Sequence, residues 1–146
     1  MTPSPLDTSK PDMRRIHDYW LGGKDNFAAD RERAQLIEAA CGPVPAGQVS
    51  VPRRNARASR LFLQRAVGYV AGQRVAQFAH LAAGLPAPAH YTPLHEVARE
   101  PVPGARFCYV DGDPVTVSLT RAITDGQDVT VAEGHLGEPE IGRAHV

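Results

Sequence analysis

A short polar segment between two expected helices carries the first residues that could do chemistry, Gly22-Gly23-Lys24-Asp25-Asn26. Gly22 and Gly23 predict the end of one helix, because glycine takes the left-handed conformation without a Cβ penalty. Asp25 or Asn26 then predicts the start of the next helix as its N-cap residue. Free backbone N–H groups, one ammonium and side-chain oxygens meet at this corner, which therefore suits a small polar ligand. An ordinary tight connection between two helices explains the same residues equally well.

Further candidate residues follow three expected strands, which lie at 74–81, 105–110 and 128–133. In an open parallel sheet, ligands bind at the carboxyl ends of the strands. The segments that leave these strands contain His80–Gly84, Asp111 with Asp113, and Glu133–Leu136. A carboxylate at the place of Asp111 can accept hydrogen bonds from ribose hydroxyls. Asp113 precedes Pro114 and is instead expected to cap the next helix.

Several other kinds of site lack their sequence patterns. His90 and His95 do not have the spacing of zinc ligands, and the chain contains no H-E-x-x-H, so no metal site is predicted. The chain has neither a G-x-S-x-G nucleophile segment nor a P-loop, and Ala82-Ala83-Gly84 departs from the dinucleotide-binding G-x-G-x-x-G. These patterns argue against a hydrolase, a P-loop NTPase and a dehydrogenase.

The spacing of apolar residues predicts three helices before the first strand. Asp12 is expected to cap the first helix, and the third is expected to run from about Pro52 to Ala71 with its arginines on a solvated face. The expected apolar stripes are Met13, Ile16 and Trp20 in the first helix, Phe27, Ala34, Ile37 and Cys41 in the second, and Phe62, Leu63, Ala66, Val67 and Val70 in the third.

The second part of the chain alternates strands and helices. A short helix is expected over residues 95–99, and another from Pro114 to about Thr124. Strand, helix, strand, helix and strand with short links predict an α/β fold with a doubly wound parallel sheet.

Composition limits the partners and the compartment. Sixteen basic and sixteen acidic residues cancel, so no overall field attracts nucleic acid or an anionic membrane surface. The first residues have no apolar signal-peptide core, and no apolar run is long enough to span a bilayer. Cys41 and Cys108 lie among apolar residues and are expected to be reduced, buried thiols. These features predict a cytoplasmic protein with neither a nucleic-acid nor a membrane partner.

The segment from His17 to Arg31 resembles the N-terminal signature of a family of actinobacterial S-adenosylmethionine-dependent methyltransferases, long known as a domain of unknown function. The resemblance continues through Arg57–Val67, Gly84–Pro86, His95–Ala98 and Tyr109–Val115, and it covers about residues 12–136. It implies a Rossmann-like fold, S-adenosylmethionine as the cofactor, and methyl transfer to an acceptor that the sequence does not identify.

The resemblance also implies which residues bind the cofactor. Gly84 and Asp111 would contact S-adenosylmethionine, and the corner formed by Gly22, Gly23 and Lys24 would fold over it.

Two positions depart from the family pattern. Where the family has acidic-x-Gly-x-Gly, this chain has His80, Ala82 and Gly84. The carboxylate that would pair with the ammonium group of the cofactor is therefore replaced by a histidine. His135 replaces an Asp that meets the adenine amino group, although one histidine nitrogen can still accept a hydrogen bond. The alternative function is therefore a catalytically inactive, methyltransferase-like ligand-binding or regulatory protein.

The sequence and the resemblance together give the expected organisation of the chain. A flexible tail over residues 1–11 precedes a helical segment at 12–73 and a truncated Rossmann-like cofactor-binding domain at 74–140. Residues 141–146 match the translated start of a common short-read sequencing adapter and are expected to be non-native. The chain is thus expected to be the N-terminal part only of the methyltransferase fold, an inactive fragment of a longer natural protein.

Overall fold

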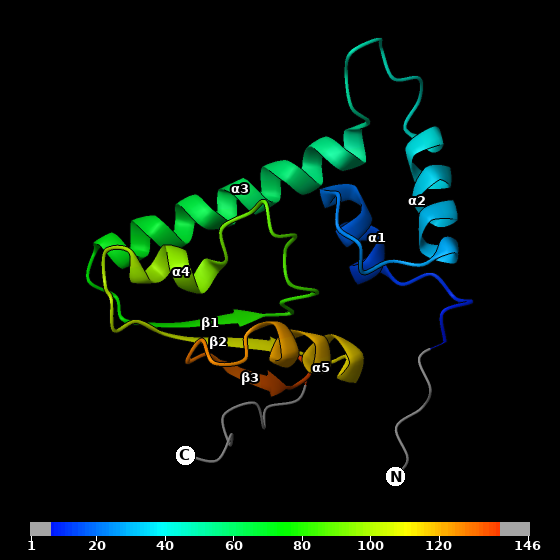
Figure 1. Ribbon diagram of the computed structural model, residues 1–146. Coiled ribbons are helices and arrows are strands. Elements are labelled where there is room, and N and C mark those ends of the chain that lie inside the picture. Colours follow the sequence, from blue (N-terminus) through cyan, green and yellow to red (C-terminus); the bar gives the residue numbers. More distant parts are fainter. Residues whose placement is uncertain (1–6, 138–146) are drawn as a thin grey trace. The chain divides into compact units, whose positions relative to one another are not determined.

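The computed structural model describes residues 7–137. The first part of the expected tail and the adapter-like residues 141–146 lie outside the described residues. The chain divides into two compact units, whose helices and strands are labelled in Figure 1. The first unit comprises Met1–Phe62 with Ala87–Tyr91, and the second comprises Leu63–Pro86 with Thr92–Val146. The predicted boundaries at 12–73 and 74–140 stay a prediction.

The first unit begins with helices α1, Met13–Leu21, and α2, Ala28–Ala40. Asp12 caps α1 by accepting the N–H of Arg14 at 2.8 Å, and Gly22 ends the helix with φ 83°, as predicted. The predicted cap of α2 at Asp25 or Asn26 is wrong, since Phe27 is the N-cap residue. Phe27 offers no side-chain acceptor, and its own N–H is instead bound by the Asp30 carboxylate at 2.8 Å.

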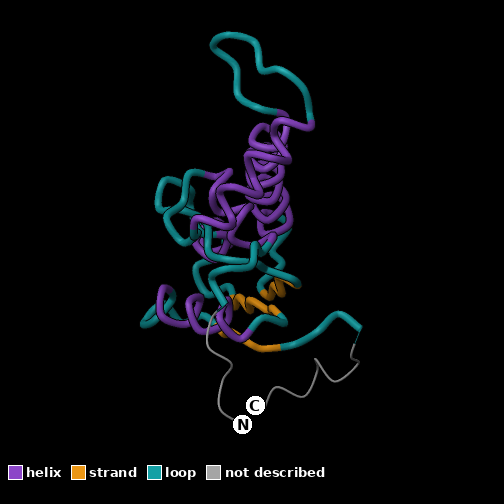
Figure 2. Tube along the Cα trace, turned by 90° about the vertical axis from the view of Figure 1, so that its right-hand side faces the viewer, coloured by secondary structure: helices purple, strands orange, loops and turns teal. Residues whose placement is uncertain are grey.

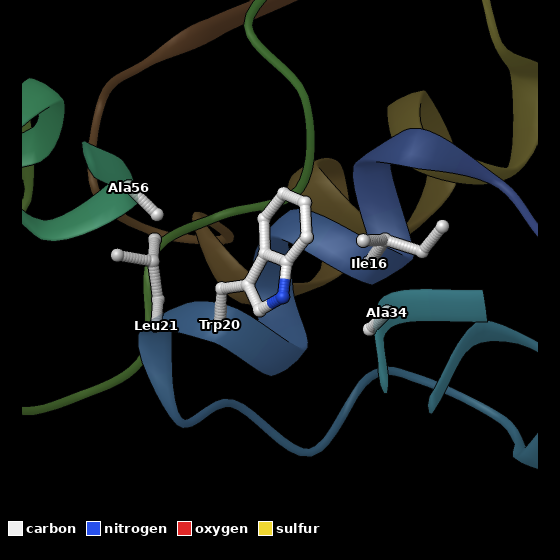
Figure 3. Packing of buried hydrophobic residues seen from close by; sticks show 5 residues of the cluster. All are labelled: Ile16, Trp20, Leu21, Ala34 and Ala56. Carbon is white, nitrogen blue, oxygen red and sulfur yellow. The ribbon is translucent and has the colours of Figure 1, made fainter. Parts of the chain in front are cut away.

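A small apolar cluster forms the core of the first unit (Figure 3). Its buried members are Ile16, Trp20 and Leu21 of α1, Ala34 of α2 and Ala56 of the third helix. Three predicted core residues lie outside it, because Met13 is 59 % exposed, Phe27 is 37 % exposed, and Cys41 is an exposed thiol at the end of α2. The expected apolar stripes of the first two helices therefore reach the core only in part, from Ile16 to Leu21 in α1 and around Ala34 in α2.

Helix α3, Val51–Gly72, contributes to both units. Leu63 and Val67 pack in the core of the second unit, as predicted, but Phe62 is 61 % exposed because a helix turns about 100° between neighbouring residues. The arginines are not all solvated. Arg53 lies over the Tyr19 ring at 4.4 Å and donates to Glu38 at 3.0 Å, which ties the three helices of the first unit together.

The second unit is built on three strands, β1 Gln77–Leu81, β2 Arg106–Asp111 and β3 Thr130–Glu133. The strands pair in the order β1-β2-β3, and both pairs are parallel, which confirms the predicted sheet (Figure 1). Figure 2 shows the strands in orange. Strand β1 starts later than predicted, because Arg74 takes φ 68° and interrupts the extended backbone. Its residues alternate between exposed and half-buried, so the prediction of a buried strand is wrong.

Helices α4, Leu94–Arg99, and α5, Pro114–Ile123, join the strands. Residues of α4, of β2 and of the link between them form a second apolar cluster, whose buried members are Leu94, Ala98, Ala105 and Phe107. Helix α5 packs on β2 and β3, and it is capped by Asp113 with Pro114 in its first turn, as predicted. No helix within residues 7–137 is both long and apolar enough to cross a membrane.

Candidate functional site

Asp111, the last residue of β2, joins the segments that follow all three strands. Its Oδ2 accepts the N–H of Gly84 at 2.8 Å, and its Oδ1 accepts the N–H of Asp113 at 3.0 Å. Its main-chain oxygen accepts the N–H of Gly134 at 3.0 Å. The residue is only 5 % exposed, so this edge of the sheet is organised around one buried carboxylate.

The segment after β1 has the open backbone expected of a ligand site. Gly84 takes φ 66°, a conformation that favours glycine, and no atom lies within 4 Å of the place where a Cβ would be. Ala82 also takes a left-handed conformation, with φ 50°, although it carries a methyl group. The N–H of Ala83 donates to Val110 of β2 at 3.0 Å, which holds the segment at the carboxyl end of the sheet.

His135 reaches the same edge from the segment after β3. A Cβ on Gly112, the residue next to Asp111, would collide with Nδ1 and Cε1 of the His135 ring. The His135 side chain is otherwise exposed. The structure thus brings Gly84, Asp111 and His135 to one edge of the sheet, where the sequence places three of the predicted cofactor-binding residues.

His80 lies inside β1 and contacts the next strand. It pairs in register with Tyr109, and the two ring centroids are 6.0 Å apart. The Tyr109 hydroxyl also lies 2.9 Å from Nδ1 of His95 on α4, and burial of His95 lowers its pKa. Two segments of the family resemblance, around His95 and Tyr109, therefore contact each other and support the fold.

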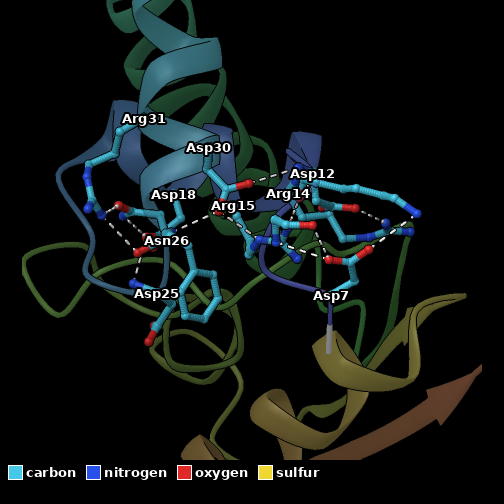
Figure 4. Close-up of polar contacts among 12 residues, drawn as sticks. Asp7, Asp12, Arg14, Arg15, Asp18, Asp25, Asn26, Asp30 and Arg31 are labelled. Carbon is cyan, nitrogen blue, oxygen red and sulfur yellow. Dashed lines mark hydrogen bonds and ion pairs between the residues drawn. The ribbon is translucent and has the colours of Figure 1, made fainter. Parts of the chain in front are cut away.

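The polar corner of the first unit is built around a residue that the sequence analysis missed. Asp18 is 3 % exposed, and its Oδ2 accepts the N–H of Asp25 and the side-chain amide of Asn26, each at 2.9 Å (Figure 4). Gly23 lies so close to this carboxylate that a Cβ would overlap it. The donors to Asp18 come from Asp25 and Asn26, seven and eight residues further along the chain, so the sequence around Asp18 gives no signal of this role.

These contacts correct the prediction of free backbone N–H groups at the corner. Gly22 and Gly23 donate to main-chain oxygens of α1 at 3.0 and 2.9 Å, and Asp25 donates to Asp18. Lys24 is exposed. Burial raises the pKa of Asp18, although the hydrogen bond from Asn26 opposes this effect. Within the first unit, the corner is therefore a tight helix connection that presents one lysine.

A second buried carboxylate, Asp30, was also missed by the sequence analysis. It accepts the N–H of Asp12 and Nε of Arg15, both at 2.8 Å, in addition to the N–H of Phe27 (Figure 4). Burial acts to raise its pKa, but the hydrogen bonds from Arg15, Asp12 and Phe27 outweigh burial and hold the pKa below its ordinary value. Asp30 thus joins the starts of α1 and α2.

Within residues 7–137, no three His, Cys, Asp or Glu side chains converge as metal ligands would.

A family model described as S-adenosyl methyltransferase matches residues 1–141. The chain belongs to this family. The resemblance drawn from the sequence motifs is therefore confirmed at the level of the family. No protein with a curated description matches the chain.

Two solved structures resemble this member of the S-adenosyl methyltransferase family. One is a protein from Thermobifida fusca YX, described provisionally as a methyltransferase, with 37 % identity and a TM-score of 0.75 over 96 % of this chain and 50 % of that one. The other is a DUF574 family protein from Streptomyces avermitilis MA-4680, with 31 % identity and a TM-score of 0.70 over 88 % of this chain and 45 % of that one. The chain spans about half the length of these solved relatives. The helical first part and the three parallel strands agree with a partial Rossmann-like fold.

Proposed function

We propose that the chain is part of an S-adenosylmethionine-dependent methyltransferase and binds this cofactor at the carboxyl ends of β1, β2 and β3. The acceptor of the methyl group is unidentified. The observation that carries the proposal is the meeting of Gly84, Asp111 and His135 at this edge, which is where open parallel sheets bind nucleotide ligands. Membership of the S-adenosyl methyltransferase family supports the same ligand.

The residues at the edge fit the adenosine part of such a cofactor. Gly84 leaves open space beside its backbone, and Asp111 places a carboxylate where nucleoside-binding sheets hold ribose hydroxyls. His135 can accept one hydrogen bond from the adenine amino group through a ring nitrogen. His80 cannot supply a negative charge to pair with the ammonium group of the cofactor. Cofactor binding here therefore depends more on the adenosine part than on the amino acid part.

The roles of these residues are binding and orientation. The cofactor, when bound, supplies a methyl group on a sulfonium, and transfer depends mainly on alignment with the acceptor in a site that excludes water. No general base is proposed. Gly22, Gly23 and Lys24 belong to the other unit, and the proposal that they also contribute to cofactor binding rests on the family resemblance of their segment.

The remaining features of the proposal concern partners. The cofactor is the only small-molecule partner proposed, and the zero net charge gives no reason to add nucleic acid or a membrane surface. The cytoplasmic location stays a prediction. The departures at His80 and His135 keep an inactive, ligand-binding relative as the competing function.

Isothermal titration calorimetry of the 146-residue chain with S-adenosylmethionine and S-adenosylhomocysteine tests the proposal. We expect saturable binding of both compounds, and we expect the variant His80→Asp to bind S-adenosylmethionine more tightly because it restores the missing carboxylate. ATP, which shares the adenosine group but lacks the amino acid part, should gain nothing from that substitution. Absence of binding in both the wild type and His80→Asp would contradict the proposal and favour the inactive relative.

A further inference from the structure

We propose that Asp111 is a positioning residue, whose carboxylate shapes the segment after β1 before any ligand arrives. A carboxylate at the end of the second strand is otherwise expected to act through direct contact with ribose hydroxyls. The inference rests on the proposed function for the identity of the ligand, but its structural part concerns the ligand-free protein.

The segment after β1 needs external support to keep its conformation. Ala82 and Gly84 both have left-handed backbone angles, with φ values of 50° and 66°, and Ala82 pays a steric cost for this. Two hydrogen bonds to β2 hold the segment, from Ala83 to the Val110 oxygen and from Gly84 to the Asp111 carboxylate. Asp111 is thus the side chain that fixes the backbone beside the open space at Gly84.

Burial distinguishes this role from one of ligand contact alone. A carboxylate waiting only for ribose would be hydrated in the ligand-free protein, because an ionised group loses free energy when it leaves water without donors. Asp111 is 5 % exposed, and each of its carboxylate oxygens already accepts a backbone N–H, from Gly84 and from Asp113. A ligand would therefore meet a carboxylate that the backbone of the protein already holds in place.

The influence of Asp111 extends to the other two segments at the edge. Its main-chain oxygen accepts the N–H of Gly134, and its neighbour Gly112 carries the ring of His135 against its backbone. Movement of Asp111 would therefore shift the surroundings of both Gly84 and His135.

The test compares Asp111→Asn with the matched control Asp113→Asn. Asparagine at 111 keeps the shape but offers one acceptor oxygen for two separated N–H groups, whereas asparagine at 113 can still cap α5. The probes are adenosine and 2′,3′-dideoxyadenosine, which lacks both ribose hydroxyls, titrated into the ¹⁵N-labelled chain. We expect Asp111→Asn to weaken the binding of 2′,3′-dideoxyadenosine by a factor of about ten, as for loss of a charged hydrogen bond within the protein, and that of adenosine by at least as much. We expect Asp113→Asn to change the binding of neither probe more than about twofold, because its hydrogen bonds at α5 remain.

Direct ribose contact alone predicts another pattern. In that case Asp111→Asn would weaken adenosine and leave 2′,3′-dideoxyadenosine unchanged, which would overturn the inference. Failure of wild-type chain to bind adenosine would instead contradict the proposed function.

Hydrogen exchange in the ligand-free wild type tests the structural part without any variant or ligand. We expect the Gly84 amide to exchange slowly in the wild type and in Asp113→Asn, and at least tenfold faster in Asp111→Asn, because only that substitution removes its charged acceptor. If Asp111→Asn does not fold, the wild-type measurement still decides, since a Gly84 amide that exchanges as fast as one in an unfolded chain would overturn the inference.

Discussion

Ala82 offers a direct test of the backbone conformation after β1. An L-residue in the left-handed region costs about 1–2 kcal/mol, and Ala82 has φ 50°. Replacement by glycine removes this cost but adds about 0.4–1 kcal/mol of unfolded-state entropy. The Ala82 side chain is exposed, so no packing is lost. We expect Ala82→Gly to stabilise the chain by about 0.5–1 kcal/mol, which raises Tm by about 1–3 °C.

Urea denaturation followed by circular dichroism measures this difference, with Ala83→Gly as the matched control. Ala83 is the next residue, does not have a positive φ and is half-buried, so glycine there should destabilise by at least about 0.4–1 kcal/mol, through unfolded-state entropy and the loss of a partly packed methyl group. The prediction is that the two substitutions change the free energy of unfolding in opposite directions. Equal losses of stability in both variants would refute the left-handed conformation of Ala82.

Three further predictions concern the first unit. Gly23→Ala should destabilise by about 1–3 kcal/mol, because its Cβ would overlap the buried Asp18 carboxylate, whereas Gly72→Ala, with open space around it, should not; thermal melts compare them. Although burial opposes it, hydrogen bonding holds the pKa of Asp30 below its usual value, so its stabilisation is complete above the unfolded pKa and is lost as pH falls through the folded one. Asp30→Asn should therefore lose stability at neutral pH and show a weaker dependence on acid in urea titrations; an unchanged acid dependence would contradict this. Burial raises the pKa of Asp18, so the stability that its protonated form contributes is lost as pH rises through the folded pKa. Wild type should therefore lose stability between acid and neutral pH relative to Asp18→Asn, which does not titrate; the reverse trend would exclude a raised pKa.

Sequence patterns predicted the helices and strands better than the contacts between them. The parallel strands and the cap at Asp113 follow from local signals, a period-two or apolar run and an Asp before Pro114. The cap of α2 could not be predicted in this way, because Phe27 is a poor cap by type. Its N–H is satisfied locally by Asp30, three residues further along, but Asp30 is held in place by the N–H of Asp12 at the start of α1, and that tertiary contact has no local signature.

The same limit applies to the candidate site. Placing Asp111 at the carboxyl end of β2 needed only the strand boundary, and the structure confirms that position. Its bond to Gly84 needed the register of β1 against β2, which no sequence spacing gives. The corner at Gly22 and Gly23 was predicted as a helix end, but Asp18 could be recognised as its organiser only once the chain folded back on it.

The central claim is that a cofactor with an adenosine group binds at the carboxyl ends of β1, β2 and β3. Titration of the ¹⁵N-labelled chain with S-adenosylhomocysteine, followed by amide chemical shifts, tests it most directly. The account predicts saturable shifts at Gly84, Asp111, Gly112 and Gly134, the backbone groups gathered around the Asp111 carboxylate. Unchanged shifts at these four amides in the presence of excess ligand, or shifts confined to other segments, would contradict it.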